Sequence, residues 1–196
     1  SSSYAALGDK GSITIDGGNI TCEGNDGAGI GGSSNVTKGT IGTVTINGGT
    51  INATSIGFGA AIGSGSASAS DGTVVINGGT INAESRSGAG IGGGSNNAGI
   101  VTINGGEINA ASIYGAGIGG GYGKNGFGND ITITDGLVKA VSQKGSGIGP
   151  GYYSGTADVA EEKLTIENSP FIFASGGSGG MEKGIYKQDD SENWSN

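Results

Sequence analysis

The chain has 196 residues, of which 47 are glycine and none is histidine, and its formal net charge is −8. Frequent glycine excludes a helical bundle or a coiled coil, and no run of about 18 apolar residues is present to insert into a membrane. An acidic chain with a single arginine is a poor partner for nucleic acid, and without histidine it lacks the commonest general base and metal ligand.

Residues 1–11 precede a repeat and are expected to form an N-terminal cap or linker. The repeat starts at Ser12, Thr43, Thr73, Ile100 and Asp130, with sequences such as SITIDGGNITC and TVTINGGTINA. Each copy is followed by a glycine-rich block such as GAGIGG or GAGIGGG, and a sixth, degenerate copy begins KLTIENSPFIF. Self-similarity at about 27–33 residues predicts a solenoid or a propeller.

The spacing of apolar residues inside the repeat favours the solenoid. Each copy holds three short stretches with a period of two, separated by glycine-containing corners, whereas a propeller blade needs four strands in about 40–45 residues. We therefore predict an all-β, right-handed parallel β-helix of about six coils over residues 12–181, with three short strands per coil. Residues 182–196 break the pattern and are expected to form a C-terminal cap or linker.

Stacking of the coils predicts columns of like residues at the strand spacing of about 4.8 Å. Isoleucines, Ile76 among them, fill the inward columns, and Cys22 is expected to be a small core residue. In the sixth coil the same offsets predict that Phe171, Phe173 and Met181 point inward. The NGG corners place Asn47, Asn77 and Asn104 in one column, where their amides can form a ladder of hydrogen bonds.

The glycine-rich blocks predict a flat face. In GAGIGGG the alternate outward residues are Gly88, Gly90 and Gly92, so this face is expected to be bare. It could serve lateral self-association with a second copy of the chain or contact with a polysaccharide. Alternatively, the glycines only let the backbone turn.

The connection after each glycine-rich block varies most in length, which often marks the binding edge of a solenoid. Tyr122 and Tyr152 lie four residues after Ile118 and Ile148, so they are expected on adjacent coils. Tyrosine rings are amphipathic platforms suited to sugars. The predicted ligand-binding residues are Tyr122, Tyr152, Tyr153, Phe127 and Tyr114.

Carboxylates are scattered along the chain. Glu84 and Glu107 are the nearest to an acid–base pair, yet the spacing does not force them together, so no catalytic residue is assigned. A structural calcium ion is the only cofactor considered, with Asp26, Asp130 and Asp158 as candidate ligands. A column of outward threonines suggests an ice- or mineral-binding array as an alternative. Its members are Thr14, Thr45, Thr102, Thr132 and Thr165, and Val75 interrupts it.

The sequence pattern VTINGGTINA…GAGIGGG resembles glycine-rich parallel β-helix repeats of secreted and wall-attached bacterial proteins, which are carbohydrate-binding or adhesin-like. The architecture is also similar to the pectate-lyase-like β-helix superfamily, where polysaccharide lyases and glycoside hydrolases are common. The resemblance implies an extracellular or cell-surface, non-catalytic module that contacts polysaccharide or a surface glycan. A polysaccharide lyase or hydrolase and a structural stalk remain alternatives.

Overall fold

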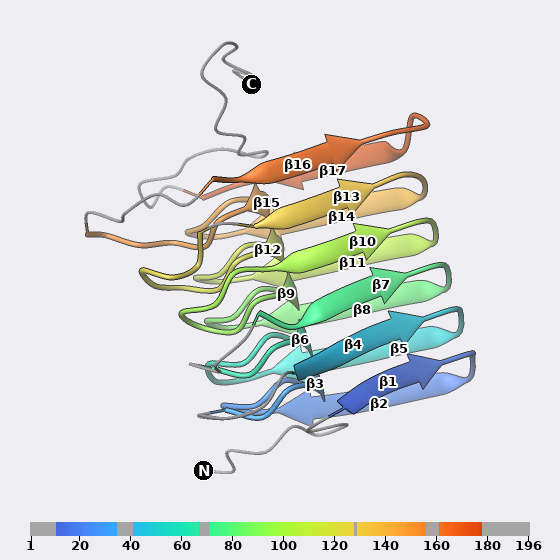
Figure 1. Ribbon diagram of the computed structural model, residues 1–196, viewed down its shortest axis with the longest axis horizontal. Coiled ribbons are helices and arrows are strands. Elements are labelled where there is room, and N and C mark those ends of the chain that lie inside the picture. The colour runs from blue at the N-terminus through green and yellow to red at the C-terminus, as the bar shows by residue number, and fades with distance from the viewer. Residues whose placement is uncertain (1–10, 35–40, 67–70, 128, 156–160, 178–196) are drawn as a thin grey trace.

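The computed structural model describes residues 11–34, 41–66, 71–127, 129–155 and 161–177, and these form a stack of β-strand coils (Figure 1). Five coils have three strands each, and a sixth has two among the described residues. The first strands of the coils are β1 (Gly11–Ile15), β4 (Ile41–Ile46), β7 (Thr73–Ile76), β10 (Ile100–Ile103), β13 (Asp130–Ile133) and β16 (Lys163–Ile166). The second strands are β2 (Asn19–Gly24), β5 (Thr50–Ser55), β8 (Thr80–Ser85), β11 (Glu107–Ser112), β14 (Leu137–Ser142) and β17 (Phe171–Ser175). The third strands are β3 (Ile30–Gly31), β6 (Ile62–Gly63), β9 (Ile91–Gly92), β12 (Ile118–Gly119) and β15 (Ile148–Gly149).

Equivalent strands of successive coils pair in parallel and build three sheets. We call them the first, second and third sheets, after the position of their strands in each coil; their orders are β1-β4-β7-β10-β13-β16, β17-β14-β11-β8-β5-β2 and β15-β12-β9-β6-β3. The first and second sheets face each other, and the NGG corners join them at the right of Figure 1. The predicted parallel β-solenoid with three strands per coil is therefore confirmed.

Isoleucine and valine columns fill the space between the sheets. Ile46, Ile76 and Ile103 pair on successive strands, and each is completely buried. Ile51, Ile81 and Ile108 form the facing column on the second sheet, where they are also completely buried. Because each coil is only one strand thick along the stack, its apolar side chains are covered mainly by the coils on either side.

The sixth coil departs from the predicted register. Ile172 and Ala174 pair with Val138 and Ala140 and pack on the core, whereas Phe171 and Phe173 are 70% and 54% exposed. The expectation that these two phenylalanines point inward is wrong. The corner before β17 contains one more residue than the other corners, and a shift of one residue moves every side chain of a strand to its other face. Met181 lies outside the described residues.

The third sheet is buried in the described coils, which overturns the expectation of a bare glycine face. Residues 27–34, 59–65, 87–95, 115–121 and 145–151 are all buried, including Gly88, Gly90 and Gly92. A Cβ at Gly90 would lie only 2.8 Å from the nitrogen of Ala111 and 2.7 Å from the oxygen of Gly117. Lateral self-association through this face has no exposed glycine surface to use.

The connections that follow β9 and β12 cover this sheet from outside. A Cβ at Gly93 would collide with the carbonyl oxygen of Asn97, and one at Gly120 with that of Gly126. Within each glycine-rich block the chain also closes a tight loop, as in the hydrogen bond of 2.7 Å from the Ala89 nitrogen to the Gly93 oxygen. The blocks are glycine-rich because backbone packs directly on backbone there, where a side chain has no room.

Polar ladders hold the corners in register. Asn77 donates to the Asn47 side chain at 2.7 Å and accepts from Asn104 at 2.8 Å, as the NGG motif predicts. At the opposite corner, buried serines donate to carbonyl oxygens of the preceding coil, as from Ser112 to Gly88 at 2.8 Å. Such bonds satisfy backbone acceptors that burial would otherwise leave unpaired.

We expect Ile76→Asp to abolish cooperative folding and Thr102→Asp to have a mild effect. The first change places an unpaired carboxylate in the core, which costs several kcal/mol, whereas Thr102 lies on the outward side of its strand. Urea unfolding followed by circular dichroism measures both. Equal midpoints would contradict the register described above.

We expect Gly90→Ala to destabilise the protein by roughly 1–3 kcal/mol, as overpacking does. The matched control is Gly17→Ala, because no atom lies within 4 Å of a Cβ built at Gly17. Thermal unfolding of the two variants separates crowding from the general effect of replacing glycine. A Gly90→Ala midpoint equal to that of the Gly17→Ala variant would show that the third sheet has room for side chains.

Candidate functional site

Three tyrosines meet at the edge where the variable connections begin. The ring centroids of Tyr122 and Tyr152 are 6.0 Å apart with an interplanar angle of 39°. Tyr114 lies 6.0 Å from Tyr122 in an edge-to-face contact of 67°. Tyr122 is 37% exposed, and the other two rings are half-buried. We call these residues the tyrosine cluster; the predicted adjacency of Tyr122 and Tyr152 is confirmed.

Backbone pairing between coils positions the cluster. The main-chain nitrogen of Tyr152 donates to the main-chain oxygen of Tyr114 at 2.8 Å. The main-chain nitrogen of Tyr122 donates to the main-chain oxygen of Ser87 at 2.8 Å. Each connection therefore returns over the corner of the coil before it. This places Tyr114 and Tyr152, 38 positions apart in the chain, on adjoining columns with Tyr122 next to both.

The two other aromatic candidates lie differently. Tyr153 follows Tyr152 and is half-buried. Phe127 is only 5% exposed, so its ring is unavailable to a ligand and the expectation that it binds one is wrong. As part of the connection that covers the third sheet, Phe127 adds to the core instead.

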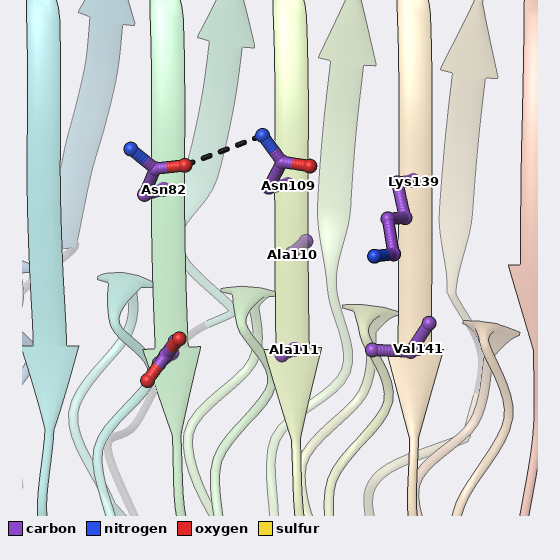
Figure 2. A pocket seen from close by; sticks show the side chains of 7 residues that line it. Asn82, Asn109, Ala110, Ala111, Lys139 and Val141 are labelled. Atoms are coloured by element: carbon purple, nitrogen blue, oxygen red, sulfur yellow. Dashed lines mark hydrogen bonds between the residues drawn. The ribbon is translucent and has the colours of Figure 1, made fainter.

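A hollow lies on the outer face of the second sheet, and the sequence did not point to it. It has a volume of about 250 Å³ and is lined by residues of β8, β11 and β14: Asn82, Glu84, Asn109, Ala110, Ala111, Lys139 and Val141. Figure 2 shows Asn82 and Asn109 side by side at one end and Ala111 and Val141 at the other, with Lys139 next to them on β14. We call it the second-sheet hollow.

The register of the second sheet explains the hollow. Glu84, Ala111 and Val141 occupy one outward column, and the small Ala111 leaves a gap between its two longer neighbours. In the adjoining column an amide ladder runs along the stack: Asn82 donates to Asn52 at 2.9 Å, and Asn109 donates to Asn82 at 3.2 Å. These asparagines occupy the same position in successive repeats. That regularity in the sequence could have predicted an amide ladder on this face.

The calcium candidates do not converge in the described residues. Asp130 forms an ion pair of 3.0 Å with Lys163 of the next coil, and Asp26 lies at the other end of the stack, in the first coil. Asp158 lies outside the described residues. Among the residues that the structure describes, no group of three or more Asp, Glu, Cys or His side chains could hold a metal ion.

Glu84 and Glu107 are not brought together as an acid–base pair. Glu84 pairs with Ala111, and Glu107 pairs with Thr80, so the two glutamates are four residues apart along neighbouring strands. At about 3.3 Å per residue their backbones are offset by roughly 13 Å. The register therefore places the two glutamates near opposite ends of their strands instead of side by side.

The threonine column is present but interrupted. Thr45, Val75 and Thr102 pair on successive strands, as predicted. The neighbouring outward column contains Ile100, which is 37% exposed, and the Asp130–Lys163 ion pair. A regular double threonine array therefore does not form on this sheet.

Three parallel sheets wound from one chain with a period of about 30 residues define a parallel β-solenoid. The sequence model of the family described as Beta helix repeat matches residues 13–34, 44–66, 74–95, 101–122 and 131–152, which is more than half of the chain. The chain belongs to this β-helix repeat family. No curated protein and no solved structure matches it. The described residues contain no helix that is long and apolar enough to cross a membrane.

We expect Cys22 to react slowly with iodoacetamide in the folded protein at pH 8 and faster in the urea-unfolded chain. Burial raises the pKa of the Cys22 thiol, so the folded state holds fewer thiolates at that pH. Because the pKa of the thiol is higher in the folded protein than in the unfolded chain, folding is favoured while the thiol stays protonated. This contribution to stability is lost as the pH rises above the pKa of the unfolded thiol, about 8.5. Cys22→Ala is the control, since Ala53 fills the paired position. Equal alkylation rates in the two states would contradict this burial.

Proposed function

We propose that this protein is a non-catalytic module that binds polysaccharide outside the bacterial cell through its tyrosine cluster. The observation that carries the proposal is the contact of Tyr122 with both Tyr114 and Tyr152 at the edge of the solenoid. Three rings from two coils offer a continuous amphipathic surface whose length follows the stack.

The cluster supports contact with a sugar chain rather than a deeply enclosed small molecule. Tyr122 is 37% exposed, while its neighbours hold it from both sides. A ring fixed in this way loses little conformational entropy on binding, and its face can pack against the apolar face of a sugar while its hydroxyl remains in water. Since the rings are tilted by 39° and 67°, we expect them to contact successive sugars at different angles.

The surroundings of the cluster support binding without turnover. Glu84 and Glu107 lie near opposite ends of neighbouring strands on the second sheet, so the register does not place them side by side as the acid and base of a glycosidase. The proposal therefore assigns recognition to the described surface and assigns chemistry to none of its residues.

The test is a double variant, Tyr122→Ala with Tyr152→Ala. Each ring lost is expected to weaken polysaccharide binding by roughly 0.5–1.5 kcal/mol, with a small change in melting temperature because the rings lie outside the core. A glycan array identifies the ligand, and titration calorimetry then measures the affinities of the parent and the variant.

Phe171→Ala is the matched control, because it removes an aromatic ring that is 70% exposed at the end of β17 beside Leu137, away from the tyrosine cluster. The control is expected to bind as the parent does. Unchanged affinity of the tyrosine double variant would overturn the proposal. Unfolding of that variant would show that the rings stabilise the edge of the fold instead of binding a ligand.

A further inference from the structure

The second-sheet hollow presents an unpaired positive charge on a protein whose net charge is −8. None of the described residues forms an ion pair with Lys139, whereas Lys163 on the first sheet is paired with Asp130 at 3.0 Å. Figure 2 shows the Lys139 side chain lying along β14 between the levels of Asn109 and Val141, with its ammonium group on the side of β11. The ammonium group thus lies beside the hollow.

Two hydrogen-bond acceptors also line the hollow. The amide ladder runs in one direction, so Asn109 uses its nitrogen on Asn82 and turns its side-chain oxygen toward β14 (Figure 2). Glu84 adds a carboxylate two strands away from Lys139, a backbone separation of roughly 10 Å across the sheet. Between these groups the floor is apolar, formed by Ala111 next to Val141.

This arrangement has the chemistry of a site for one sugar ring that carries an acid group. Lys139 would donate a charge-assisted hydrogen bond to the acid group. Glu84 and the Asn109 oxygen would accept bonds from hydroxyl groups, and the apolar face of the ring would pack on Ala111 and Val141. A volume of about 250 Å³ is below the ~300–1,000 Å³ of sites for drug-sized ligands, which favours a single ring.

We infer that the second-sheet hollow is a subsite for an anionic sugar, carboxylated or sulfated, with Lys139 as the residue that selects the acid group. The inference rests on the proposed function, because it makes the hollow and the tyrosine cluster two contacts of one polysaccharide. Tyr114 follows Ala111 by three residues along β11 and the corner after it, so the two sites are separated by roughly 10 Å. A sugar chain that runs from the hollow along the direction of β11 to this corner reaches both.

The experiment uses three oligosaccharides of one length and backbone: a cello-oligosaccharide, its C6-carboxylated form and its C6-sulfated form. Titration calorimetry compares the parent, Lys139→Gln and Lys163→Gln; both variants remove one positive charge, so their net charges are equal. We expect the parent to bind at least one charged form roughly fivefold more tightly than the neutral form. Lys139→Gln is expected to lose this preference and Lys163→Gln to keep it. The tighter of the two charged forms identifies the acid group.

Added salt provides a second readout, since the preference of the parent should fall as ionic strength screens an exposed charge. Equal behaviour of Lys139→Gln and Lys163→Gln would overturn the inference. So would binding of the neutral and both charged forms with equal affinity. If the tyrosine double variant then still loses affinity for all three forms, the proposed function stands while the subsite does not.

Free glucuronate and glucose 6-sulfate test the hollow independently of the tyrosine cluster. The side-chain amide resonances of Asn82 and Asn109 are followed by NMR in the parent and in Lys139→Gln. Shifts in the parent that disappear in the variant support the subsite even if the tyrosine double variant binds normally, which would overturn the proposed function alone. No shift with either sugar acid would overturn the subsite.

Discussion

At the third sheet, the carbonyl oxygens of one coil occupy the space where the coil before it would place a Cβ. A Cβ at Gly29 would lie 2.8 Å from the oxygen of Ala61, and one at Gly117 would lie 2.7 Å from the oxygen of Gly147. This backbone-on-backbone packing requires glycine on strands and loops alike. It also lets the connections cover the sheet, so Ile62, Ile91 and Ile118 reach the core from a segment that is itself buried.

The close packing of the glycine-rich blocks explains how a chain with so few large apolar residues forms a core. Leu, Ile, Val and Phe account for only 38 of the 196 residues, a proportion near that of disordered chains. The solenoid concentrates most of them into a few columns, while glycine backbone fills the remaining interior at the density that side chains supply in other folds. Serines such as Ser85 and Ser142 then satisfy the carbonyl oxygens that this arrangement buries.

The first and second sheets could be predicted from the sequence because their side chains alternate, and the period of two reports which face is buried. The orientation of the third strand could not be predicted in this way. Glycine has no side chain, so the alternation at Gly88, Gly90 and Gly92 carries no information about inside and outside. The error at Phe171 and Phe173 had a different cause. The corner between the first and second strands has the same length in the first five coils, so the same length was expected in the sixth. The sixth corner is one residue longer and includes Asn168 and Ser169 at positive φ.

The candidate sites lie at outward positions where the side chain differs from one coil to the next while the backbone conformation stays the same. Tyr122 and Tyr152 continue a column that contains Ser66 and Ser95. Lys139 follows Asn52, Asn82 and Asn109 in a column that continues to Phe173. A solenoid presents each outward position once per coil at about 4.8 Å. A change of side chain on neighbouring coils therefore creates a local surface without any cost to the core. The substitutions that form the tyrosine cluster and the second-sheet hollow all fall within the third to fifth coils, at the same end of β8, β11 and β14. Their concentration in one region is the reason to treat the two surfaces as parts of one binding edge.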